Sequence, residues 1–134
     1  LSAVDFVVPA LEIVDSRIYN WNISIADTIA DNASSANYIL GNKVFRLDQL
    51  EITQFNAKLF ANGELKSEGT GRDCLGSPLN SLLWLAKNMI KLNNPLRAGH
   101  VVLSGALGPM YTMKGKETIE AKFDTFEKLI LHLD

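Results

Sequence analysis

Residues 50–71 place the strongest constraint on the fold, because apolar and polar side chains alternate there on either side of Asn62-Gly63. Such alternation is typical of two β-strands, and an Asn-Gly pair supplies the two positive-φ residues that a type I′ turn needs. The segment therefore predicts a β-hairpin. We attach no function to it, because the turn is a structural device.

Residues 77–94 form the one strong helix pattern in the sequence. Ser77 can cap this helix, and Pro78 suits its first position. Apolar residues recur along it at helical spacing: Leu79, Leu82, Leu83, Ala86, Met89 and Ile90. Because Trp84 and Leu85 widen this stripe, we expect the helix to be buried on two sides, with a neighbouring subunit as one candidate for the second side.

The rest of the chain consists mainly of strand patterns. Residues 10–16 and 100–105 predict short strands, the second of them buried, and residues 117–133 predict a closing strand or hairpin. Residues 17–41 mix polar loop residues with a short strand-like or helical patch, where Asp27 could cap a helical turn. This order predicts an α+β domain that is mostly β, and it argues against a doubly wound parallel sheet.

The composition is that of one soluble globular domain. The chain has 134 residues, of which 47% are hydrophobic and 21% are charged, and its formal net charge is -2. No Lys/Arg cluster marks a nucleic-acid or membrane surface, and the apolar runs are too short to cross a bilayer. The single cysteine, Cys74, excludes an intrachain disulfide and fits a reducing, cytoplasmic setting.

The beginning of the sequence indicates a segment of a longer polypeptide. It opens with Leu1, and "SAVDFVVPA" is typical of the end of a helix that runs through Pro9 into a strand. We therefore expect residues 1–134 to be the C-terminal part of a longer protein, although a processed chain would look the same.

Glu12 is the first candidate for chemistry. If residues 10–16 are extended, Glu12 shares a face with Ala10 and Val14, so its carboxylate lies among apolar neighbours. A buried and unpaired carboxylate is costly, and such groups lose their charge, pair with a cation or bind a metal. On this pattern alone, a salt-bridged or solvent-reaching glutamate is favoured over a metal ligand.

Two further stretches combine small and hydrogen-bonding residues. Residues 27–36 could build a polar pocket wall for an oxyanion or carboxylate from Asp31, Asn32, Ser34 and Ser35. A capped loop that satisfies its own backbone is the favoured interpretation of that stretch. Residues 98–110 end a buried strand at Ser104-Gly105, where exposed N–H groups can hold an anion, and a plain strand-to-turn transition explains this stretch equally well.

Common catalytic signatures do not occur in the sequence. It contains no Walker A loop, no G-x-G-x-x-G, no Cys/His metal spacing and no G-x-S-x-G elbow. We expect His100 and His132 to be surface histidines. Cys74 is expected to be a structural thiol, because Arg72 is its one evident basic neighbour.

Three long motifs carry a resemblance to a known family. They are "VVPALEIVDSRIYNWNISIADTIADNASSANYILG", "GRDCLGSPLNSLLWLAKNMI" and "PLRAGHVVLSGALGPM", and the match extends to about Met113. On these motifs the sequence resembles the C-terminal half of the 2-keto-4-pentenoate (2-hydroxypenta-2,4-dienoate) hydratases, in the fumarylacetoacetate hydrolase-like superfamily. The "SGALGPM" turn looks more like these hydratases than like the related 4-oxalocrotonate decarboxylases or 2-oxohept-4-ene-dioate hydratases.

The resemblance implies a mixed β-roll within a single catalytic domain whose N-terminal part is absent from residues 1–134. It implies a divalent Mg²⁺ or Mn²⁺ held by three carboxylates, of which Glu12 is one and a preceding Glu-x-Glu pair supplies two. It also makes Ser34 the best candidate for a hydrogen bond to the substrate, with Ser104 and Gly105 as weaker candidates for binding the substrate carboxylate. The expected catalytic Lys precedes this chain, so no catalytic residue is assigned within it.

The activity implied by the resemblance is that of a metal-dependent hydro-lyase. Water would add to 2-hydroxypenta-2,4-dienoate to give 4-hydroxy-2-oxopentanoate, in the meta-cleavage breakdown of aromatic compounds. The alternatives are a 4-oxalocrotonate-type decarboxylase and an inactive fragment or structural subunit, and residues 1–134 alone are expected to be inactive. A homo-oligomer is expected, with a related decarboxylase or the next pathway enzyme as candidate partners.

Overall fold

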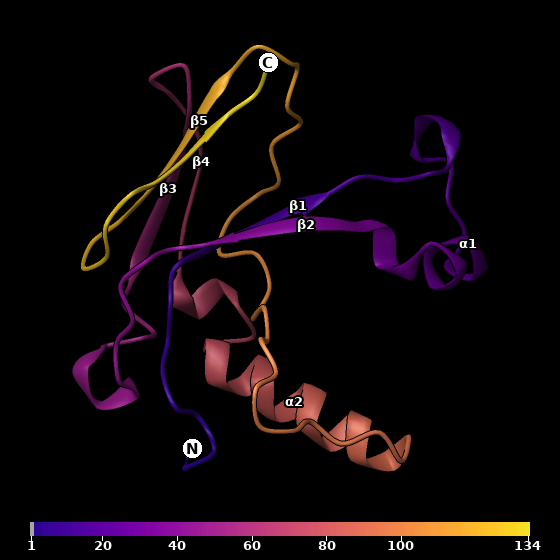
Figure 1. Cartoon of the computed structure of the whole chain (residues 1–134), viewed down its shortest axis with the longest axis vertical. Helices are drawn as coiled ribbons and strands as arrows, with labels where there is room; N and C mark the ends of the chain where they lie inside the picture. The colour runs from indigo at the N-terminus through magenta and orange to yellow at the C-terminus, as the bar shows by residue number, and fades with distance from the viewer. Residues whose placement is uncertain (1) are drawn as a thin grey trace.

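The predicted hairpin forms one side of a four-stranded antiparallel sheet, whose strand order is β4-β3-β5-β6 (Figure 1). In the computed structural model, which describes every residue after the first, β3 (Asn56–Ala61) and β4 (Glu64–Thr70) are joined at Asn62-Gly63. Both turn residues have positive φ, 49° and 84°, as a type I′ turn requires. The predicted closing hairpin also forms: β5 (Thr118–Phe123) pairs with β3 and β6 (Leu129–His132) with β5.

The best-buried apolar side chains belong mostly to this sheet: Ala61, Ile119, Ala121 and Leu129. Four phenylalanine rings cluster beside it, with centroids of neighbouring rings 4.6 to 6.1 Å apart: Phe45, Phe55, Phe123 and Phe126. Edge-to-face pairs of this kind add to the free energy gained by burial alone. The cluster therefore fastens the segment that carries Phe45 and Phe55 to the sheet.

A second, two-stranded sheet extends away from the first (Figure 1). It pairs β1 (Ala10–Val14) with β2 (Ser35–Leu40), and a bulge shifts the register between Ile13 and Val14. At its base the backbone of Asn42 donates to Glu127 Oε1 at 2.9 Å, which links this ribbon to the loop between β5 and β6. The other end of the ribbon continues into α1 (Ile25–Ala30).

Short helical turns connect these elements. Four 3₁₀ turns are present among the described residues: η1 (Tyr19–Trp21), η2 (Asn32–Ser34), η3 (Leu47–Gln49) and η4 (Gly71–Asp73). The predicted cap of α1 at Asp27 is wrong by three residues, because Ser24 is the N-cap and Asp27 completes a capping box. The Ser24 hydroxyl accepts from the Asp27 N–H at 3.2 Å, and the Asp27 carboxylate accepts from the Ser24 N–H at 2.8 Å.

The long helix α2 (Pro78–Lys91) begins where the sequence predicts, with Ser77 accepting from the Leu79 N–H at 3.3 Å. The expected burial on two sides is not observed within the described chain, where α2 has no fully buried residue. Leu83 and Trp84 are 53% and 61% exposed, because no other element of residues 2–134 packs on that side. None of the helices described is long and apolar enough to span a membrane.

The strand predicted over residues 100–105 does not form. Residues 101–107 donate no backbone hydrogen bond within the described chain, because no strand lies beside them to accept one. The segment instead crosses β4 where two glycines allow close approach. A Cβ added to Gly69 would lie 2.5 Å from the Leu107 carbonyl carbon, and one added to Gly108 would lie 2.6 Å from the Glu68 carbonyl oxygen.

Candidate functional site

Glu12 lies in the middle of β1, opposite Tyr38 of β2, and its side chain is exposed. The pattern placed Glu12 on one face with Ala10 and Val14 and favoured a salt-bridged or solvent-reaching side chain, and the structure has the solvent-reaching one. The physical reason is that β1 pairs with β2 alone, so no further layer covers this face of the ribbon. Within residues 2–134 the Glu12 carboxylate makes no hydrogen bond or ion pair, which agrees with a solvent-reaching glutamate.

The donor chemistry of Glu12 suits one position in the coordination of a divalent cation. A carboxylate is the hard oxygen ligand that Mg²⁺ and Mn²⁺ prefer, and this one is not engaged by any group of the described chain. Among residues 2–134, however, no group of three or more His, Cys, Asp or Glu side chains could hold a metal ion. Within the described residues, Glu12 could therefore supply one carboxylate to a metal site and could not form such a site with its neighbours.

Asp31 organises the polar turn that follows α1. Its carboxylate accepts from Ser34 Oγ at 2.9 Å, from the Arg17 N–H at 3.2 Å and from Ser16 Oγ at 3.4 Å, and it lies 3.3 Å from Arg17 Nε. Burial acts to raise the pKa of the Asp31 carboxyl, but the Ser34 and Arg17 hydrogen bonds and the Arg17 charge hold that pKa below its usual value. The network ties the end of β1 to the start of β2.

Ser34 is 2% exposed and donates its hydroxyl proton to Asp31. It ends a run of three residues with positive φ, Asn32, Ala33 and Ser34, at 50°, 57° and 55°. This conformation is unfavourable for residues other than glycine, so the surrounding hydrogen bonds must hold it. The turn thus satisfies many of its own polar groups, and the Ser34 oxygen keeps the capacity to accept a hydrogen bond. Its contact with a substrate remains a prediction.

Ser104 and Gly105 line a cavity of about 390 Å³ between the N-terminal half of α2 and the segment after it. The cavity wall also contains the following residues: Asp73, Cys74, Leu75, Ser81, Trp84, Leu85, Val102, Leu103 and Ala106. Gly105 has a φ of 105°, which glycine adopts readily, and its N–H donates to no group of the described chain. This backbone donor is available to an anion.

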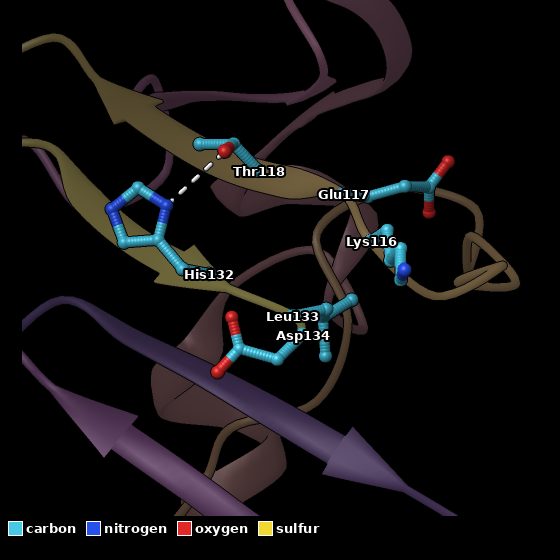
Figure 2. Close-up of a pocket in the computed structure, with 6 residues that line it drawn as sticks. All are labelled: Lys116, Glu117, Thr118, His132, Leu133 and Asp134. Atoms are coloured by element: carbon cyan, nitrogen blue, oxygen red, sulfur yellow. Dashed lines mark hydrogen bonds between the residues drawn. The ribbon is translucent and has the colours of Figure 1, made fainter.

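The two histidines make local contacts. His100 Nδ1 accepts from the Arg97 N–H at 3.3 Å, and His132 Nδ1 lies 3.1 Å from Thr118 Oγ1. His132 and Thr118 line an open hollow of about 450 Å³, and Figure 2 shows the Glu117 carboxylate pointing away from them. That carboxylate is engaged by the Tyr111 hydroxyl at 2.9 Å, so the hollow has no convergent set of catalytic groups.

The structure brings the Glu12 and Ser34 regions together and leaves Ser104-Gly105 apart from them. Ser34 lies opposite the end of β1, since the Asp15 N–H donates to the Ser34 carbonyl at 2.8 Å, three residues beyond Glu12. No hydrogen bond or ion pair of the described chain joins Glu12 or Ser34 to Ser104-Gly105. Sequence reasoning missed the part played by Arg17, whose guanidinium also donates to the Ser35 carbonyl at 2.7 Å. The only signal for its pairing with Asp31 was the presence of opposite charges in "DSR" and "ADN".

The family model described as fumarylacetoacetate (FAA) hydrolase C-terminal matches residues 1–133. The chain belongs to the fumarylacetoacetate hydrolase family. This confirms the resemblance that the three sequence motifs indicated, and the observed α+β fold with one main helix agrees with it.

Curated members of the family are similar over most of the chain. It is 46% identical over 124 residues to 2-keto-4-pentenoate hydratase 1 of Dechloromonas aromatica (strain RCB), covering 92% of the chain and 47% of that protein. It is 52% identical over 120 residues to 2-keto-4-pentenoate hydratase of Paraburkholderia xenovorans (strain LB400), covering 90% and 45%. The chain therefore spans about half the length of the curated relatives it matches.

Solved structures with this fold include 4-oxalocrotonate decarboxylase from Pseudomonas putida G7, complexed with magnesium and adipate. The two superpose with a TM-score of 0.92 at 26% sequence identity, over 96% of this chain and 49% of that one. A second structure of that decarboxylase, complexed with calcium and acetate, superposes with a TM-score of 0.88 at the same identity.

Proposed function

We propose that residues 1–134 are the C-terminal part of a catalytic domain that adds water to 2-hydroxypenta-2,4-dienoate and yields 4-hydroxy-2-oxopentanoate. The observation that carries this proposal is the 46% and 52% identity to 2-keto-4-pentenoate hydratases over about nine tenths of the chain. The reaction belongs to the breakdown of aromatic compounds by meta-cleavage. The protein that contains this chain is then a hydro-lyase.

A 4-oxalocrotonate-type decarboxylase is the second candidate, because a structure of that enzyme superposes with a TM-score of 0.92. Its sequence identity is 26%, about half of that with the hydratases, so the hydratase is the favoured activity. Product analysis separates the two. A hydratase converts the dienoate without releasing CO₂, whereas a decarboxylase releases one CO₂ for each molecule of its oxo-acid substrate.

Glu12 is proposed as one ligand of a divalent metal, Mg²⁺ or Mn²⁺. Its exposed carboxylate has no partner within residues 2–134, and a neighbour of the same fold was solved with magnesium or calcium and a carboxylic acid. A metal in this position supplies Lewis-acid polarisation of a 2-oxo acid. The carboxylate of Glu12 would contribute negative charge and one oxygen ligand.

Ser104 and Gly105 are proposed to bind the substrate carboxylate, since the unpaired Gly105 N–H faces no acceptor of the described chain and the pair lines a cavity. Ser34 is proposed to contact a hydroxyl group of the substrate. Because its proton is donated to Asp31, its oxygen is free only to accept, so the group it meets must be a donor.

The test of the metal role is Glu12→Gln in the protein that carries this chain, with Glu51→Gln as the matched control. Glu51 is also an exposed glutamate, and its side chain makes no hydrogen bond or ion pair within the described residues. We expect Glu12→Gln to lose most hydratase activity and to bind Mg²⁺ more than tenfold more weakly by calorimetry, whereas Glu51→Gln behaves as wild type. Full activity of Glu12→Gln, or activity undiminished by a chelator, would contradict the proposed metal role.

The assembly is proposed to be a homo-oligomer located in the cytoplasm, in which the exposed side of α2 contacts another subunit. The interface is supported by three apolar residues of α2 that are 53%, 61% and 62% exposed: Leu83, Trp84 and Ile90. The cytoplasmic location is supported by the single cysteine, which is a free thiol. Contact with a related decarboxylase or the next pathway enzyme is the alternative use of this side. Trp84→Glu should lower the mass measured by sedimentation, and an unchanged mass would contradict the α2 interface.

A further inference from the structure

Residues 101–113 make no backbone-to-backbone hydrogen bond within the part of the chain that the structure describes, either as donors or as acceptors. The segment belongs to the orange chain that leads from α2 to β5 in Figure 1, and it is drawn there without a strand arrow. Backbone N–H and C=O groups are strong hydrogen-bonding groups, and nearly all of them find partners in folded proteins. A run of this length without backbone partners therefore needs an explanation.

Water is an incomplete partner for these groups, because residues 102–104 are half-buried and buried backbone groups are almost always paired. The sequence Val101–Leu103 is apolar and rich in β-branched residues, as in a buried strand. Residues 101–106 contain no bend or turn, and φ is negative up to Ser104, so the backbone already has the course of a strand. What this segment lacks is a neighbouring strand.

One edge of the segment is occupied and the other is free. In a strand, the N–H and C=O of one residue point to the same side, and those of the next residue point to the opposite side. The Ser104 carbonyl points to Cys74, which contacts α2, so the backbone groups of Val102 point to that side as well. Those of Val101 and Leu103 point the other way, where no backbone group of the described residues meets them.

We propose that Val101 and Leu103 form the edge to which the rest of the protein adds a β-strand, hydrogen-bonded to this chain through the backbone. The inference rests on the proposed function, in which residues 1–134 are the C-terminal part of a longer catalytic domain. Addition of a strand to an open edge is a common mode of recognition, and backbone hydrogen bonds supply its affinity. What the inference adds is the surface on which the two parts of the domain meet.

The added strand belongs to the same protein rather than to a second copy. The superposition with the decarboxylase covers 96% of this chain and 49% of that one. The uncovered part of this chain is shorter than residues 101–113, so part of the segment keeps its course within a chain about twice as long. A strand attached to the same polypeptide is available to every molecule at any protein concentration, whereas a second copy must be recruited from solution.

Hydrogen–deuterium exchange on the whole protein that carries this chain, resolved to single amides by mass spectrometry, tests the pairing. The Val101 and Leu103 amides should exchange about 100-fold more slowly than in an unstructured peptide, and the Val102 amide between them about tenfold faster than its neighbours. This alternation is specific to pairing along one edge, since burial alone would slow all three amides. Equal protection of the three, or no protection, would overturn the proposal.

The same measurement at two protein concentrations separates the two sources of a strand. Protection of Leu103 that persists at a concentration where sedimentation shows dissociated subunits supports a strand of the same protein. Protection that disappears on dissociation assigns the strand to a second copy and overturns the proposal. Hydratase activity of the same sample tests the proposed function separately, because alternating protection in an inactive protein would contradict only the activity.

A pair of proline variants of the whole protein tests the free edge independently. Proline has no N–H, so Val101→Pro should remove a hydrogen bond to the added strand, whereas the Val102 N–H points to the occupied side. Both variants lose the same side chain, and Val102 is the more buried, so packing alone predicts that Val102→Pro is the less stable.

We expect the reverse, with a melting temperature about 3 °C lower for Val101→Pro than for Val102→Pro. A Val102→Pro variant that melts at the same or a lower temperature would contradict the assignment of the edge. Exchange on the unmodified protein decides the question if neither variant folds.

Discussion

The crossing of β4 by the segment that follows α2 can be tested at Gly69. An alanine Cβ there would overlap the Leu107 carbonyl, whose carbon would lie 2.5 Å away and whose oxygen would lie closer still, whereas ordinary contacts begin at 3.4 Å, so one backbone must move. Neither backbone can yield as a flexible side chain would. Overpacking costs typically 1–3 kcal/mol, and we expect Gly69→Ala to reach about 3 kcal/mol in the free energy of unfolding.

Gly63→Ala is the matched control for this substitution. Gly63 has a φ of 84° and open space where a Cβ would be added, so alanine there meets only the cost of the left-handed conformation, about 1 kcal/mol. Urea unfolding followed by far-ultraviolet circular dichroism gives both values from the shift of the midpoint. If the two variants lose the same free energy, the steric account of the crossing is wrong.

Three further outcomes are expected from the local contacts. Ser77→Ala should lower the free energy of unfolding by about 1 kcal/mol in a urea titration, because the Leu79 N–H loses its acceptor at the start of α2. Asn62→Ala should cost about 2 kcal/mol in the same assay, since alanine tolerates the φ of 49° poorly and the Thr118 N–H loses a partner at 2.9 Å. The Asp31 carboxyl should titrate below its ordinary pKa of 3.8 when followed by NMR, and a midpoint at or above 3.8 would contradict this. Its contribution to the free energy of unfolding is therefore present above pH 3.8 and disappears as the pH falls through the lowered pKa.

Local signals predicted the elements whose structure is decided by neighbouring residues. The Asn62-Gly63 turn formed because both residues accept positive φ, and α2 began after Ser77 because its hydroxyl accepts from the first turn. The register of β3 and β4 follows from that turn for the two nearest pairs, and a bulge between Leu59 and Phe60 then shifts it. These features need no partner that is distant in the sequence, so periodicity and turn chemistry are sufficient to predict them.

Features that depend on distant partners were predicted less well. Residues 100–105 have the composition of a buried strand, yet a strand also requires a neighbour, and the described chain supplies none. The alternation around Glu12 placed its carboxylate among apolar neighbours, but burial depends on a second layer that does not cover β1 here. The attachment of Cys74 to Ser104 joins residues thirty positions apart, and no sequence pattern indicates such a contact.

The exposure of Glu12 changes what must be explained about this residue. A buried carboxylate would need a partner to offset its desolvation, whereas an exposed one needs none, so its chemistry depends on which groups are brought to it. One carboxylate binds Mg²⁺ weakly, and further oxygen ligands must be placed around the same point. Because β1 is paired with β2 and tied to Ser34 through Asp15, the backbone position of Glu12 is fixed within the described chain. If Glu12 is a ligand as proposed, the affinity of the whole protein for Mg²⁺ should depend on the oxygen ligands that the rest of the protein brings to this face of β1.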